Sequence, residues 1–238
     1  MATLATSVSA ITAERRFYLM LAAIIAVTVF AGFGLDLQRT DWNIVGLPAQ
    51  VHLHAAVFFG WIILYVAQNW LVDRGSIAIH RRLGVATACL VPVMVVVGVA
   101  TTVMAVRLNR VPPFFTPGLF LALDLQIIGF AILAGWAIQL RHRSDWHKRL
   151  MLCATILIMS PALGRILPMP LLGPFGPLAV FAAMSVYVLA GMAYDVKRRG
   201  RVHPAYWWGA AVLVVTQALV GPLGFSPPIL RLVARLAA

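Results

Sequence analysis

Charged residues are scarce in this chain. Of its 238 residues only 11% are Asp, Glu, Lys or Arg, whereas 62% are hydrophobic and the mean hydropathy is +0.92. A soluble domain of this size needs a much larger charged surface, because its outside faces water. The composition therefore excludes an ordinary soluble fold and predicts an all-α, polytopic transmembrane protein.

Cysteine is equally rare, and the common catalytic motifs are missing. Cys89 and Cys153 both lie in apolar runs, and the sequence has no Cys-x-x-Cys and no Cys/His spacing typical of zinc sites. A nucleophile elbow, a P-loop, an H-E-x-x-H motif and a histidine set large enough for a di-iron centre are also missing. We therefore expect two small buried thiols, and no enzyme class is predicted.

Seven apolar segments are long enough to cross about 30 Å of hydrocarbon. The predicted spans are residues 17–35, 51–72, 83–107, 118–140, 149–167, 176–196 and 205–225. Residues 1–16 are expected to form a flexible cytoplasmic N-terminus and residues 17–228 a single seven-helix domain. The tail 229–238, with Arg231 and Arg235 spaced i, i+4, is expected to lie along the membrane interface.

The positive charge is concentrated in alternate connections. The formal net charge is +12, and of the 19 Lys and Arg residues 13 lie in the N-terminal segment and the second, fourth and sixth connections. This asymmetry places the N-terminus in the cytoplasm and the C-terminus outside. Cations between apolar runs serve membrane topology, so we expect membrane lipids as partners and no nucleic acid. Association into an oligomer or larger complex stays open.

One motif occurs twice. "AIHRRLGVATACLV" (78–91) and "SDWHKRLMLCATIL" (144–157) align when the chain is shifted by 67 residues, so that His80 matches His147 and Arg82 matches Arg149. This repeat predicts two duplicated hairpins, about residues 51–107 and 118–167, forming a four-helix core flanked by the first, sixth and seventh helices.

The repeated motif has two interpretations. Its cations hold the connections in the cytoplasm and contact lipid phosphates. Alternatively, His80 and His147 face each other across the core and ligate one haem b iron, while Arg82 and Arg149 contact the propionates. The identity of any cofactor is left open at this stage.

The motifs "HRRLGVA" and "HKRLMLCATILIMSPALGRILP" resemble a family of small, uncharacterised bacterial membrane proteins in which H-[KR]-R-L-[GM] opens two helices. The resemblance covers about residues 50–168 and implies a bacterial inner-membrane location and a fold, but no activity. A weaker similarity to the four-helix core of b-type di-haem cytochromes implies haem binding. Those cytochromes place paired histidines well inside their helices, whereas no histidine lies in the middle of a span here.

Ionisable residues within spans are candidates for a site, because their burial costs several kcal/mol unless they are paired. The outer-side candidates for a ligand pocket are His52, His54, Asp124, Gln126 and Arg165. We expect Asp124 and Arg165, at similar depth on neighbouring helices, to form an ion pair. That pair either specifies helix packing or belongs to a pocket that takes a small molecule, a lipid group or a metal from the outer side.

An aromatic and polar stripe follows one face of the second span. His54, Phe58, Trp61, Tyr65 and Gln68 are spaced by three or four residues. The stripe either packs the core or lines a cavity, so Trp61 and Tyr65 join the pocket candidates.

The functional prediction is a binding or accessory membrane protein with a polar pocket near its periplasmic side. The alternatives are a b-type haem redox protein and a small proton-linked transporter. The sequence shows no pair of interrupted hydrophobic segments typical of ion-coupled transporters, although Pro92 and Pro161 lie at mid-span and are expected to loosen the backbone locally.

Overall fold

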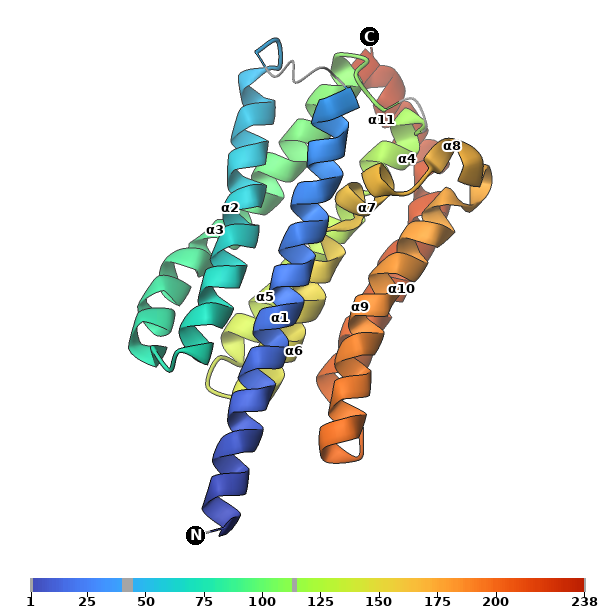
Figure 1. The fold of residues 1–238 in the computed structure, drawn as a ribbon. Coiled ribbons are helices and arrows are strands. Elements are labelled where there is room, and N and C mark those ends of the chain that lie inside the picture. The colour runs from blue at the N-terminus through green and yellow to red at the C-terminus, as the bar shows by residue number, and fades with distance from the viewer. Residues whose placement is uncertain (1, 40–44, 113–114, 238) are drawn as a thin grey trace.

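The chain folds into a bundle of long helices (Figure 1). The structure, a computed structural model, describes residues 2–39, 45–112 and 115–237, with side chains from residue 11 onward. The helices are α1 Ala2–Arg39, α2 Ala49–Asp73, α3 Ile77–Arg107, α4 Pro117–Ala122, α5 Asp124–Gln139, α6 Ser144–Leu157, α7 Ser160–Ile166, α8 Met169–Leu172, η1 Gly173–Phe175, α9 Gly176–Arg199, α10 Pro204–Gly224 and α11 Pro227–Ala237. Six helical segments in this part of the chain are long and apolar enough to span a membrane, and the bent pair α6–α7 makes up to seven. A multi-pass, all-α membrane protein is therefore confirmed.

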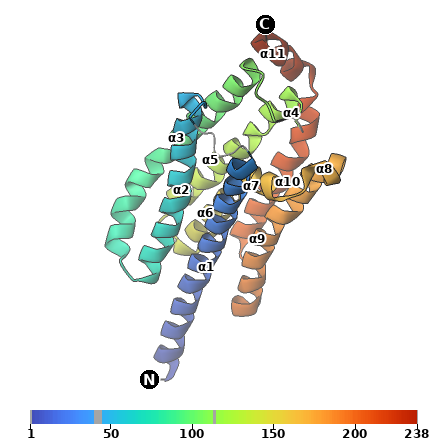
Figure 2. The same cartoon turned by 45° about the horizontal axis from the view of Figure 1, so that its top comes forward.

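The long helices run side by side and their connections alternate between two ends (Figures 1 and 2). The turns α2–α3, α5–α6 and α9–α10 lie at the end where α1 begins. We call this the basic end, because these turns and the helix ends beside them carry most of the Lys and Arg residues. The other end carries α4, α8 and α11, and we call it the proline-rich end. Helices α2 and α3 pack as one hairpin and α5 and α6 as another, over the segments in which the sequence predicts the repeat.

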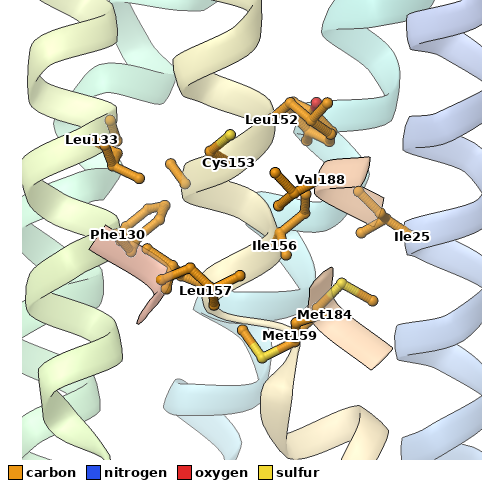
Figure 3. Close-up of a cluster of buried hydrophobic side chains, with 14 of the residues drawn as sticks. Ile25, Phe130, Leu133, Leu152, Cys153, Ile156, Leu157, Met159, Met184 and Val188 are labelled. Carbon is orange, nitrogen blue, oxygen red and sulfur yellow. The ribbon is translucent and has the colours of Figure 1, made fainter. Parts of the chain in front are cut away.

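Helix α6 lies at the centre of the bundle. It packs against α5, α9 and α10, and all of its residues from Leu152 to Leu157 are buried. Figure 3 shows Cys153, Ile156 and Leu157 of this helix surrounded by apolar side chains of α5, α9 and α1. The second half of α6 is therefore enclosed by protein on every side, and α6 is the central helix of the bundle.

The N-terminus differs from the prediction. Helix α1 continues back to Ala2, so residues 2–16 are helical where a flexible segment is expected. The segment contains neither Pro nor Gly and carries four Ala residues and one Leu, which are strong helix formers. Once the membrane span has formed the helix, extending it costs little, because nucleation is the expensive step.

The fifth span is broken. Helices α6 and α7 are bent by 49° at Ile158 and Met159. Pro161 lies in the first turn of α7, where its missing N–H and its ring interrupt the backbone hydrogen-bond ladder. Pro92, by contrast, lies inside α3 without ending it. Of the two prolines expected to loosen the backbone, Pro161 lies at a break and Pro92 does not.

The bend brings α7 against α1. A Cβ atom at Gly32 of α1 would overlap the carbonyl oxygen of Ala162 in α7. Gly34, two residues further along, has no foreign atom within 4 Å of such a Cβ. The close approach of the two backbones therefore depends on the hydrogen side chain of Gly32.

We expect Gly32→Ala to destabilise the protein by roughly 1–3 kcal/mol, the usual cost of overpacking a tight contact. Gly34→Ala is the matched control, and we expect it to be neutral or slightly stabilising. Unfolding of both variants in detergent micelles, followed by circular dichroism, measures the difference. Equal stabilities would show that α1 and α7 do not make this contact.

Candidate functional site

Arg165, predicted to pair with Asp124, pairs instead with Asp36. Its Nε donates to Asp36 Oδ2 at 2.9 Å and its NH1 donates to the carbonyl of Pro161 at 3.0 Å. The guanidinium also lies 4.4 Å from the centre of the Phe33 ring. The reason is the bend, because α7 leans onto α1 and turns its last residues toward the end of that helix.

Asp124 lies on another side of the bundle. It begins α5, and its Oδ1 accepts a hydrogen bond from Thr102 Oγ1 of α3 at 2.9 Å. Among the ion pairs of the described residues none joins Asp124 to Arg165. The expected ion pair is therefore wrong, and the two charged groups belong to separate helix contacts.

The other outer-side candidates also separate. His52 is exposed, whereas the ring of His54 stacks on Phe58 with centroids 4.2 Å apart, and its Nδ1 is buried without a hydrogen-bond partner. Gln126 is buried in the first turn of α5 and accepts a hydrogen bond from Ser160 Oγ at the start of α7. The five residues thus form no single cluster.

Gln126 marks a polar junction beside the helix break. Its Nε2 donates to Gln217 Oε1 of α10 at 3.2 Å, and Gln217 donates to the carbonyl of Pro177 at 3.3 Å. Ser160 is the first residue after the break. Helices α5, α7, α9 and α10 therefore meet through neutral polar groups at the place where the backbone of the fifth span is interrupted.

The stripe on α2 packs into the core. Trp61 is 2% exposed, its ring meets Phe130 edge to face at 4.8 Å, and its Nε1 donates to Thr155 Oγ1 of α6 at 3.3 Å. Tyr65 and Gln68 are buried as well. Of the two interpretations of this stripe, the contacts favour packing.

His80 and His147, the matching residues of the repeated motif, lie next to each other at the basic end. Their ring centroids are 6.4 Å apart and the ring planes are inclined by 80°. Each histidine lies in the first turn of its helix, α3 or α6, and both rings are half-buried. Two residues 67 positions apart in sequence are thus brought together by the packing of the two hairpins.

Neighbouring polar groups fix both rings. His147 Nδ1 lies 2.8 Å from the carbonyl oxygen of Ala137, so the ring nitrogen donates and Nε2 keeps a free lone pair. The Gln68 amide lies 2.6 Å from His80 Nδ1, and with its nitrogen turned to that ring its oxygen accepts from the N–H of Gly84. In this orientation His80 Nδ1 accepts the hydrogen bond, so the proton of the neutral ring lies on Nε2.

The separation of the rings fits two ligands of one metal. Metal–nitrogen bonds of roughly 2.0–2.1 Å place the centres of two imidazoles on opposite sides of one ion about 6 Å apart. Within the described residues no group of three or more His, Cys, Asp and Glu side chains could hold a metal ion. A centre that needs only two protein ligands is haem, whose porphyrin fills the other positions.

A second cluster at the basic end surrounds Arg149. This side chain is 0% exposed and Asp195 of α9 is 1% exposed. Arg149 Nε donates to Asp195 Oδ2 at 2.8 Å, its NH2 donates to Asp195 Oδ1, and its NH1 donates to the carbonyl of Asp145 at 2.8 Å. Glu14 of α1 accepts a longer bond from Arg149 at 3.4 Å and pairs with Lys148 at 2.8 Å. Arg149 is thus fully engaged, and its expected role as a propionate ligand is wrong.

His203 links this cluster to α10. Its Nδ1 accepts from the N–H of Ala205 at 3.2 Å and so caps the helix, and its Nε2 donates to Asp145 Oδ2 at 3.0 Å. The N–H of His203 donates to Asp195 Oδ2 at 3.1 Å. Burial holds the pKa of His203 below its ordinary value, and the hydrogen bond to Asp145 opposes that shift.

Sequence reasoning missed the acidic half of this cluster. Asp195 lies at the end of the predicted span 176–196, directly before a run of cations, where it looks like part of a solvated connection. An ionisable residue at the edge of an apolar run is a signal for a buried pair, and the same signal was available for Glu14.

Comparison with models of known protein families, with characterised proteins and with solved structures gave no match. The resemblance to a bacterial membrane family therefore depends on the repeated motif alone.

We expect Arg149→Met or Asp195→Leu to lower the free energy of unfolding by about 3–5 kcal/mol, because each leaves one buried charge unpaired. The double variant is expected to be less destabilised than either single one. Arg199→Met, which removes a more exposed partner of Glu14 at 3.9 Å, is the control and should cost less than about 1 kcal/mol. A double-mutant cycle of unfolding in mixed micelles tests this, and additive effects would contradict it.

Stability should fall in mild acid because of His203. Its folded pKa lies below the unfolded value of about 6.5, so the unfolded chain binds the proton first. The contribution of His203 to the free energy of unfolding is complete above the unfolded pKa. It is lost as the pH falls through the folded pKa, because the protonated ring cannot accept a hydrogen bond from the N–H of Ala205. Thermal unfolding from pH 8 to 5 should show the loss, and His203→Asn, a cap that does not titrate, should flatten it. An unchanged pH profile in that variant would assign the effect to other groups.

Proposed function

We propose that the protein is a membrane-embedded b-type haem protein in which His80 and His147 would hold the haem iron. The observation that carries the proposal is the pairing of their rings, 6.4 Å apart, at the start of two neighbouring spans. Both histidines come from the repeated motif, so a duplicated hairpin would supply one ligand from each copy. Such duplication is a simple route to a symmetrical two-ligand site.

In this proposal the protein residues orient the ligands. The carbonyl of Ala137 would hold the His147 proton on Nδ1 and leave Nε2 free for the metal. Ligation by Nε2 of His80 would require the Gln68 amide to turn and accept from Nδ1. Bound haem supplies one-electron chemistry. Arg82, exposed in the first turns of α3, is the candidate partner for a propionate, because Arg149 is bound to Asp195.

The orientation of the chain follows from its charges. We infer that the basic end faces the cytoplasm of a bacterium and the proline-rich end faces outward, as the excess of arginine in the α2–α3, α5–α6 and α9–α10 connections favours. The haem would then lie near the cytoplasmic face. The helix α11, with Arg231 and Arg235 on one side, would lie along the outer interface.

The absorption spectrum of the purified protein tests the proposal. We expect a Soret band after expression with added haem precursor, and a loss of at least about tenfold in bound haem for His80→Ala and for His147→Ala, since each removes an axial bond. His142→Ala, an exposed histidine two residues before α6, is the matched control and should keep the band. Gel filtration shows whether each variant is folded.

A folded protein without a Soret band would overturn the proposal. A Soret band that survives when His80→Ala and His147→Ala are combined would overturn it as well. The geometry would then favour the second candidate, a small-molecule carrier with its site at the break between α6 and α7. Interrupted helices with polar partners near the middle of the membrane are typical of such sites, and Gln126, Ser160 and Gln217 form one here.

A further inference from the structure

The basic end contains a cavity that neither the histidine pair nor the Arg149 cluster uses. Its volume is about 510 Å³, within the range of small-molecule sites. It lies between the first turns of the membrane span in α1 and the last turn of α2. The lining residues are Thr12, Arg16, Leu19, Trp70, Asp73 and Arg74.

The lining combines two cations with one carboxylate. Arg16 and Arg74 are both exposed, and Arg74 lies over the ring of Trp70, 5.7 Å from its centre. Asp73 Oδ1 is buried and has no hydrogen-bond partner. Among the ion pairs of the described residues none involves Asp73, although arginines line the same cavity. A carboxylate oxygen without a donor is costly to bury. Because Oδ1 is shielded from solvent, a ligand in the cavity would reach it through rotation of the soft carboxylate torsion of Asp73.

The position of the cavity points to a lipid. Tryptophan is enriched at the level of lipid headgroups, and Trp70 is 48% exposed at the end of a membrane span. Leu19 gives the cavity an apolar wall on the side of the span. Guanidinium groups bind phosphate through charge-assisted, often bidentate hydrogen bonds.

We propose that this cavity binds the headgroup of a zwitterionic aminophospholipid, with Arg16 and Arg74 on the phosphate and Asp73 on the primary ammonium. A primary ammonium donates hydrogen bonds, which Asp73 Oδ1 needs, whereas the quaternary ammonium of choline donates none. Choline would bind an aromatic face instead, and Arg74 already lies over one face of Trp70. The site therefore selects phosphatidylethanolamine over phosphatidylcholine.

Native mass spectrometry of delipidated protein, titrated with phosphatidylethanolamine, phosphatidylcholine and phosphatidylglycerol of equal chain length, tests this selection. We expect the ethanolamine lipid to bind about tenfold more tightly than the choline lipid, as one charge-assisted hydrogen bond implies. Asp73→Asn should reduce this preference to near one. Arg74→Gln should weaken all three lipids.

Arg143→Gln is the matched control. Arg143 also lies over a tryptophan at the basic end, 5.4 Å from the ring of Trp146, but it does not line the cavity. It should leave lipid binding unchanged. Soluble phosphoethanolamine in a thermal-shift assay separates the headgroup from the acyl chains: stabilisation by it alone would assign the site to a soluble metabolite. Equal binding of the choline and ethanolamine lipids, preference for the anionic glycerol lipid, or an unaltered preference in Asp73→Asn would overturn the proposal.

Discussion

The buried ion pair between Arg149 and Asp195 is the interaction on which the arrangement of the basic end depends. In a low-dielectric interior a lone guanidinium or carboxylate is strongly unfavourable, so neither α6 nor α9 can occupy its place without the other. Arg149 also donates to the carbonyl of Asp145 and to the carboxylate of Glu14. Asp195 also accepts a hydrogen bond from the N–H of His203. One pair thereby fixes four helices, α1, α6, α9 and α10, relative to one another.

The central position of α6 follows from the same constraint. Its apolar residues would be stable against lipid as well as against protein, so hydrophobicity alone does not draw it into the bundle. Arg149 draws α6 into the bundle, because its charge cannot face hydrocarbon. The apolar side chains that follow Arg149 are then enclosed by the neighbouring helices (Figure 3). His147, two residues earlier, is carried with it and turned toward His80.

The two ends of the molecule hold together differently. At the basic end charged groups are buried and paired, whereas toward the proline-rich end the fifth span breaks and its second half lies against Gly32 of α1. The break also explains why the outer-side candidates separate. Sequence reasoning treats the span as one straight helix, which would put Arg165 beside Asp124, but the 49° bend directs Arg165 to Asp36.

The sequence by itself determined the class of protein, the positions of the spans to within about seven residues and the alternation of their ends. Hydropathy and the length needed to cross a bilayer depend only on local composition. Tertiary structure alone decided which polar side chains pair with one another. Asp195 looks like part of a solvated connection until α9 lies against α6, and Asp124 finds Thr102 only because α3 packs on α5. Side-chain pairing depends on helix rotation and bending over distances of a few ångströms, and one sequence without its fold does not specify these.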